Sequence, residues 1–154
     1  MGKPRPGPTS RGAVVGRGSL GDSVASVIQV LIVDDDARVR EGLRTLLALD
    51  PGLRISGEAS TFDEALRAAE DLRPDVVLLD LELAADRGFA LLCALRRQGL
   101  PVIGLAVYPG GDAEALEAGA FRYLLKDAPR QQLVAAIYAA HQTRSGAAPD
   151  GLST

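Results

Sequence analysis

The sequence predicts an α/β protein with a doubly wound, five-stranded parallel sheet and helices on both faces. Short, apolar, β-branched runs recur along the chain and are typical of strands that are buried on both faces. Segments with apolar residues at 3-4 spacing lie between these runs, as in amphipathic helices. Strands that alternate with helices form parallel sheets joined by right-handed crossovers. With 154 residues, 47% of them apolar, the chain is long enough for one domain with its own core.

The elements are expected to alternate from residue 27 onward. Residues 53–59 are more polar than the other strands and alternate in character, which predicts an edge strand. Thr61 and Glu64 have the spacing of a capping box at a helix start. Asp127 is expected to cap the last helix, with Pro129 in its first turn. The predicted strands are 27–33, 53–59, 76–79, 102–107 and 121–125, and the predicted helices are 36–49, a second from the Thr61 cap to about residue 72, 88–98, 113–118 and a last one after Asp127.

The ends of the chain differ in composition from its middle. Residues 1–26 are rich in Gly, Pro, Ser and Arg and show no apolar period, which predicts a disordered N-terminal tail. A basic arm for an acidic partner is the alternative, with only four basic residues to support it. The domain is expected at residues 27–143 and a flexible C-terminal tail at 144–154.

Charge and cysteine content restrict the class of protein further. The net charge is -3, and the N-terminal 27 residues carry +3, so the rest of the chain is acidic and a poor non-specific binder of nucleic acid. The single cysteine, Cys93, cannot form an internal disulfide, is expected to be buried on a helix, and fits a reducing compartment. The longest apolar stretch, residues 24–33, is too short to cross a bilayer, and no signal peptide is evident. We therefore expect a soluble, cytoplasmic protein without membrane contact.

Charged side chains follow several of the predicted strands. Asp34 and Asp35 come directly after the first strand, Asp80 follows the third, and Lys126 follows the fifth. The carboxyl ends of parallel strands meet at one rim of the sheet, so these groups should converge. Neighbouring carboxylates repel and raise one another's pKa, and Mg²⁺ is the cation that suits such an oxygen-only site. An aspartate can act as a nucleophile toward phosphorus, and a lysine can contact the phosphoryl oxygens.

Four pieces of the chain resemble a known family in their order and spacing. The resemblance covers about residues 27–142, and it is to the receiver domain of two-component response regulators, most like the receivers of LuxR/NarL-type helix-turn-helix regulators. It implies a flavodoxin-like receiver fold. The matching pieces are LIVDDD at 31–36, VVLLDL at 76–81, LEAGA at 116–120 and YLLKD at 123–127.

The resemblance also implies roles for individual residues. Asp80 is implied as the phosphoacceptor, charged by a histidine kinase. Asp34, Asp35, Asp80 and the backbone carbonyl of Glu82 are implied to hold Mg²⁺, and Lys126 to contact the phosphoryl group. No enzyme activity beyond self-catalysed phosphoryl transfer is implied.

The output side departs from the family pattern. The family has Thr or Ser at the end of the fourth strand, where this chain has Ala106. Tyr123 matches the aromatic residue whose rotamer reports activation, and the last strand and helix are the expected relay face. Ala84 and Ala85 replace the proline and glycine common after the phosphoacceptor. We expect that no DNA-binding output domain follows, and that the chain is a receiver which accepts phosphate and switches weakly, if at all.

Other functions are open at this stage. The chain could be a phosphorylation-independent pseudo-receiver that acts as a protein-interaction module, or a truncated remnant of a DNA-binding transcriptional regulator. A Mg²⁺-dependent phosphohydrolase ranks lower, because such enzymes commonly carry a second aspartate where this chain has Glu82. The acidic residues 34–36 could also simply favour a helix dipole. The expected partners are a histidine kinase, an unknown downstream protein and a second copy of the chain, with no nucleic acid bound through this domain.

Overall fold

The computed structural model describes residues 27–144. The tail predicted at residues 1–26 lies outside the described residues, and so does the predicted C-terminal tail apart from Arg144, which ends a helix. Within the described part, five parallel strands form one sheet in the order β3-β2-β4-β5-β6. The predicted fold class is confirmed.

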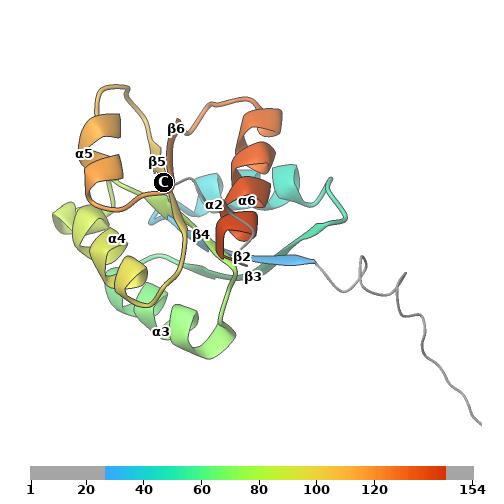
Figure 1. The fold of residues 1–154 in the computed structure, drawn as a ribbon, viewed down its shortest axis with the longest axis horizontal. Helices are drawn as coiled ribbons and strands as arrows, with labels where there is room; N and C mark the ends of the chain where they lie inside the picture. The colour runs from blue at the N-terminus through green and yellow to red at the C-terminus, as the bar shows by residue number, and fades with distance from the viewer. Residues whose placement is uncertain (1–26, 145–154) are drawn as a thin grey trace, which may run out of the picture.

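The strands and helices alternate along the chain as predicted (Figure 1). A 3-10 turn, η1, follows the third strand. In chain order the elements are β2 (Ile28–Val33), α2 (Ala37–Leu47), β3 (Leu53–Ala59), α3 (Phe62–Leu72), β4 (Val76–Asp80), η1 (Ala84–Asp86), α4 (Gly88–Arg97), β5 (Val102–Ala106), α5 (Asp112–Glu117), β6 (Arg122–Leu125) and α6 (Arg130–Arg144).

The sheet separates two apolar cores. Figure 1 shows α3, α4 and α5 on one side of the sheet and α2 and α6 on the other, as the membership of the two buried clusters confirms. Successive side chains of a strand point to opposite faces, so β2 and β4 supply residues to both cores. Each fully buried Leu or Ile contributes about 1.5–3 kcal/mol relative to exposure. These two layers hold the carboxyl ends of the strands in fixed positions.

Strand β4 lies in the interior of the sheet, between β2 and β5. All of its residues are buried, including the terminal Asp80. Val33 pairs with Leu79, and Asp80 pairs with Leu105, so β2, β4 and β5 end at nearly the same level. The more polar β3 lies at one edge, as its alternation predicted.

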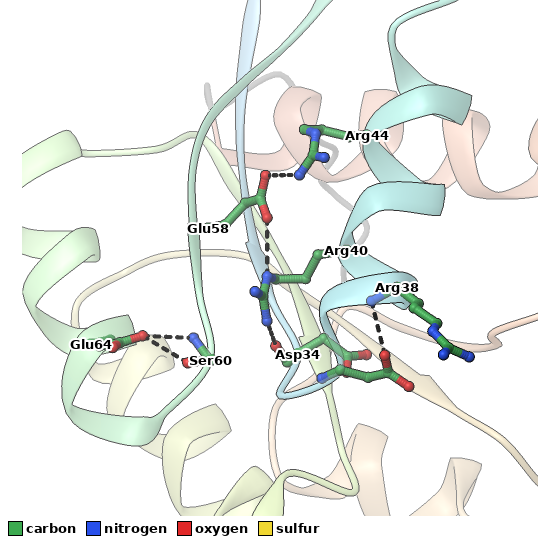
Figure 2. A network of polar contacts seen from close by, with 8 residues as sticks. Asp34, Arg38, Arg40, Arg44, Glu58, Ser60 and Glu64 are labelled. Atoms are coloured by element: carbon green, nitrogen blue, oxygen red, sulfur yellow. Dashed lines mark hydrogen bonds and ion pairs between the residues drawn. The ribbon is translucent and has the colours of Figure 1, made fainter.

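Helix α3 begins with the predicted Thr61 cap, whose hydroxyl accepts a hydrogen bond from the Glu64 backbone N–H at 3.1 Å. The reciprocal half of the capping box is different. The Glu64 carboxylate accepts from the backbone N–H and the hydroxyl of Ser60, at 2.9 and 3.0 Å (Figure 2). These hydrogen bonds from Ser60 hold the pKa of Glu64 below its usual value.

The prediction that Asp127 caps the last helix is wrong. Helix α6 begins at Arg130. The Ala128 N–H donates to the Leu125 carbonyl, which closes a turn before the helix. The carbonyl of Pro129 then accepts from the N–H groups of Gln132 and Leu133, so the first helical bonds start there.

Cys93 lies on helix α4, as predicted, but it is not among the residues that this helix buries. Its buried residues are Gly88, Leu91, Leu92 and Leu95, whereas Cys93 is only partly buried. Gly88 packs directly on the backbone of Leu81, where a Cβ would lie 2.2 Å from the carbonyl oxygen. Only glycine permits this approach, and it fixes which side of α4 faces the sheet. Among the described helices, none combines the length and apolar composition that a membrane crossing needs.

Candidate phosphoacceptor site

Two aspartates are buried at the carboxyl edge of the sheet. Asp80 ends β4 and is 2% exposed, and Asp34 directly follows β2 and is 1% exposed. They are the only charged residues in the buried class among residues 27–144. Buried carboxylates need charge partners or hydrogen bonds, so their surroundings indicate what the site is built to do.

Lys126 supplies the positive charge. Its backbone N–H donates to the carbonyl of Ala106 at 2.8 Å, which extends the β5–β6 pairing past the end of β6. Its Nζ lies 2.9 Å from Oδ2 of Asp34 and 3.2 Å from Oδ1 of Asp80. The lysine therefore bridges the two buried carboxylates, with its side chain 19% exposed.

The third carboxylate, Asp35, is exposed at the mouth of the site. Its Oδ2 accepts a hydrogen bond from the backbone N–H of Ala84 at 3.2 Å, which joins the loop after β2 to the loop after β4. One carboxylate oxygen from each of Asp34, Asp35 and Asp80 lies within 4.8 Å of the others. The structure thus brings together all four charged residues that the sequence singled out at the strand ends.

Hydrogen bonds orient the two buried carboxylates. Oδ1 of Asp34 accepts from the backbone N–H of Asp36 at 2.8 Å, and Oδ1 of Asp80 accepts from the backbone N–H of Glu82 at 2.9 Å. Oδ2 of Asp34 is fully buried and receives no hydrogen bond from the described residues, so its polar contact is the ion pair with Lys126. The Glu82 N–H and the Lys126 ammonium both contact Oδ1 of Asp80, so Oδ2 of Asp80 makes neither of these contacts.

The electrostatics of the site favour extra positive charge. Burial raises the pKa of Asp80, and the nearby charge of Asp34 adds to this effect, while the Glu82 N–H and Lys126 oppose it. Burial by itself lowers the pKa of Lys126, but the carboxylates of Asp34 and Asp80 outweigh it and hold this pKa above its usual value. Lys126 is therefore a permanent cation beside an aspartate whose charge is costly.

The donor set fits a hard divalent cation. It consists of carboxylate oxygens alone, one of which, Oδ2 of Asp34, receives no hydrogen bond from the described residues. Such sites suit Mg²⁺, which takes oxygen ligands and keeps several waters. The side chain of Glu82 is exposed. That its backbone carbonyl is a ligand of Mg²⁺ stays a prediction.

The predicted switch residues lie on the side of the site toward α5. Ala106 ends β5, is buried, and carries no hydrogen-bonding group on its side chain. It lines a pocket of about 250 Å³ together with Phe89 and Tyr123. The Tyr123 hydroxyl donates to the carbonyl of Tyr108 at 2.6 Å and accepts from the Gly111 N–H at 3.3 Å. Tyr123 thereby fastens β6 to the loop between β5 and α5.

Reasoning from the sequence missed one feature beside the site. Arg40 of α2 donates to the backbone carbonyl of Asp34 at 2.6 Å and pairs with Glu58 of β3 at 3.0 Å (Figure 2). The apolar period of α2 places Arg40 on a helix but says nothing of Glu58, which lies on another element. No pattern in a single sequence marks this contact.

The protein is thus a doubly wound α/β domain whose strand ends gather three carboxylates and a lysine at one rim of the sheet. Residues 30–138 match the family model described as response regulator receiver domain. The chain belongs to this family, and the resemblance inferred from its motifs is confirmed.

Individual relatives agree with this assignment. The nitrate/nitrite response regulator protein NarP of Escherichia coli (strain K12) is 44% identical over 119 residues, which cover 75% of this chain and 55% of NarP. A protein-glutamate methylesterase/protein-glutamine glutaminase of Myxococcus xanthus is 37% identical over 136 residues, covering 80% of this chain and 39% of that protein. The chain therefore spans about half or less of the length of these curated relatives.

Solved structures extend the likeness to the fold. A LuxR-family two-component response regulator from Aurantimonas sp. SI85-9A1 superposes with a TM-score of 0.69 at 32% identity, covering 79% of this chain and 87% of that one. This agrees with the predicted likeness to receivers of LuxR/NarL-type regulators.

Proposed function

We propose that this chain is a phosphoacceptor receiver that takes a phosphoryl group onto Asp80 from a histidine kinase, with Mg²⁺ bound beside it. The observation that carries the proposal is the arrangement of Asp80 at the end of β4. It is buried, Lys126 Nζ lies 3.2 Å from its Oδ1, and the carboxylates of Asp34 and Asp35 lie close by. Burial, a lysine and an acidic cluster are what phosphoryl transfer to a carboxylate needs.

The chemistry is a displacement at phosphorus. A carboxylate oxygen of Asp80 attacks the phosphorus of a phosphohistidine, an O–P bond forms, the P–N bond breaks, and its electron pair leaves with the imidazole nitrogen. The product is an acyl phosphate on Asp80. The ammonium of Lys126 is placed to stabilise charge on the phosphoryl oxygens, since it already contacts the carboxylate.

Asp34, Asp35 and Asp80 are the side chains that would hold Mg²⁺, with the backbone carbonyl of Glu82 as a further ligand. When bound, the ion neutralises charge on the transferred group. Asp34 presents Oδ2 to the site because its Oδ1 is engaged by the N–H of Asp36. Asp35 reaches the site from the exposed side and is braced by the Ala84 N–H.

We further propose that the response to phosphorylation is weak. Ala106 offers no hydroxyl to follow the phosphoryl group, so the hydrogen bond expected from Thr or Ser is missing. Tyr123 is meanwhile held by the Tyr108 carbonyl and the Gly111 N–H. The signal would pass through the last strand and helix face to a downstream protein or a second copy of the chain. No enzyme activity beyond self-phosphorylation, no nucleic-acid contact through this domain and a cytoplasmic location belong to the same proposal.

A small acyl phosphate such as acetyl phosphate tests the proposal without a cognate kinase. The full chain is incubated with this donor and Mg²⁺, and intact mass is measured. We expect one added phosphoryl group in the parent and none in Asp80→Asn. Equal incorporation in both proteins, or none in the parent, contradicts the proposal.

A phosphorylation-independent interaction module is the second candidate function, and Ala106 is the observation that favours it. Such a module would bind its downstream partner equally well with and without the donor. The incubation with acetyl phosphate and Mg²⁺ separates the two candidate functions, because an interaction module of this kind does not need Asp80 to accept a phosphoryl group.

A further inference from the structure

Arg40 connects three parts of the chain beside the acidic site. It belongs to α2, its side chain is 19% exposed, and its guanidinium makes two contacts at once. Nη1 donates to the backbone carbonyl of Asp34 at 2.6 Å, and Nε pairs with Oε1 of Glu58 at 3.0 Å. Figure 2 shows the guanidinium between the loop after β2 and strand β3. The fork of an arginine suits such a double contact, and a lysine cannot reproduce it.

Glu58 is a fixed anchor for this arginine. It also pairs with Arg44, one turn further along α2. Burial raises the pKa of Glu58, but the two arginines outweigh it and hold the pKa below its usual value. The carboxylate is therefore ionised at neutral pH and keeps Arg40 in place.

The contact with Asp34 is to its backbone, and the rest of that residue is also restrained. The Asp34 N–H donates to the Ala59 carbonyl at 3.0 Å, and its Oδ1 accepts from the Asp36 N–H. With Arg40 on its carbonyl, Asp34 is held on both sides of its Cα. Oδ2 is the oxygen left to face Lys126 and the site.

We propose that Arg40 is a positioning residue for the cation side of the site, and that it acts by fixing the backbone of Asp34 through the Arg40–Glu58 pair. The inference rests on the proposed function, because it assumes that Asp34 helps to hold Mg²⁺. Groups that orient metal ligands typically change metal affinity by 10-fold to 100-fold when they are removed.

A role through charge alone predicts the opposite sign. Removing a positive charge near a cation site reduces repulsion and should strengthen Mg²⁺ binding. Loss of positioning should weaken it. The direction of the change in affinity therefore separates the two roles.

Arg44 provides a matched control on the same helix. It pairs with the same Glu58 and carries the same charge, but its contact is with Glu58 and not with the Asp34 carbonyl. Its side chain is 46% exposed, so its charge is screened by solvent. Arg44→Ala tests for loss of charge and of the Glu58 pair without loss of the backbone contact.

The experiment titrates Mg²⁺ into the full chain by calorimetry and, in parallel, follows phosphoryl incorporation from acetyl phosphate. We expect the Mg²⁺ dissociation constant to rise about 10-fold in Arg40→Ala and also to rise in Arg40→Lys. Arg44→Ala should stay within about 2-fold of the parent. Urea unfolding without Mg²⁺ identifies any variant that fails to fold.

Three outcomes overturn the inference: unchanged Mg²⁺ affinity in Arg40→Ala, tighter binding in Arg40→Ala, or an equal loss in Arg44→Ala. If Arg40→Ala does not fold, Arg40→Lys decides the question: it keeps the positive charge but cannot make both contacts, so weaker Mg²⁺ binding supports positioning and unchanged binding overturns it. The results for the parent protein distinguish a failure of this inference from a failure of the proposed function. A parent that binds Mg²⁺ and accepts phosphate beside an unaffected Arg40→Ala contradicts only the role of Arg40, whereas a parent that does neither contradicts both.

Discussion

Nζ of Lys126 lies 2.9 Å from Oδ2 of Asp34, an oxygen that is fully buried and receives no hydrogen bond from the described residues. The lysine is thus the counter-ion of a buried carboxylate. In the proposed function the same side chain also contacts the incoming phosphoryl group.

Replacing this lysine should cost stability. In Lys126→Met the carboxylates of Asp34 and Asp80 lose their shared cation, and we expect the free energy of unfolding at pH 7 to fall by about 2–4 kcal/mol. Arg97→Met removes an equal charge from an exposed position of α4 and should change stability by less than about 0.5 kcal/mol. Urea unfolding of the three proteins measures both changes, and similar values for the two variants would contradict the bridging role.

The pH dependence of the Lys126 contribution has a definite sign. The folded-state pKa of Lys126 lies above 10.5, so its stabilisation is fully present below pH 10.5 and is lost as pH rises through the folded value. On the alkaline side, parent and Lys126→Met should therefore converge in stability only in strongly alkaline solution. Convergence near neutral pH is the result that this account excludes.

The charge of Asp80 has the opposite effect on stability from the charge of Lys126. Because burial and the charge of Asp34 raise its folded pKa, ionised Asp80 costs stability above that pKa, and the cost disappears as pH falls toward 3.8. We expect Asp80→Asn to be more stable than the parent at pH 7 without Mg²⁺, with the difference shrinking toward pH 4. Unfolding curves over this pH range provide the check. A variant that is less stable than the parent at pH 7 would show that the ionised carboxylate of Asp80 does not destabilise the fold.

The loop after β4 contains a backbone conformation that alanine adopts reluctantly. Ala85 has φ 62° and ψ 30°, in the left-handed region. This conformation costs a residue with a Cβ about 1–2 kcal/mol, which glycine avoids at some loss of unfolded-state entropy. Ala85→Gly should stabilise the protein by about 0.5–1 kcal/mol in urea unfolding. Ala84→Gly is the control: its φ is not positive, so it should not stabilise.

The buried Ala106 offers a test of weak switching. Ala106→Thr adds a hydroxyl at the end of β5, the strand that pairs with β4, next to a pocket of about 250 Å³ that can take part of the added volume. We expect phosphorylation to change the NMR signals of Tyr123 and Gly111 more in Ala106→Thr than in the parent. In the parent, the contacts with Tyr108 and Gly111 restrain Tyr123. Large changes in these NMR signals when the parent is phosphorylated would therefore refute weak switching.

The sequence predicted much of this arrangement because it follows from local patterns. Apolar runs located the strands, and the parallel topology then placed Asp34, Asp80 and Lys126 at one rim. The Arg40–Glu58 pair and the Asp35–Ala84 hydrogen bond could not be predicted, since each joins residues far apart in the chain.

Other details depended on three-dimensional packing. The start of α6 was placed too early because Asp127 has the chemistry of a cap, whereas the turn at Leu125 delays the helix to Arg130. The close approach of Gly88 to the backbone of Leu81 sets the inward face of α4, and the apolar period of the helix does not predict this contact. The restraint of Tyr123 by the loop after β5 was likewise invisible in the sequence.

The most direct test locates the phosphoryl group. The full chain is treated with acetyl phosphate and Mg²⁺, digested at acidic pH, and sequenced by tandem mass spectrometry. The account predicts a Mg²⁺-dependent phosphoryl group on the peptide that contains Asp80, and on Asp80 itself. A phosphoryl group on another residue, or none in a folded parent that binds Mg²⁺, would contradict it.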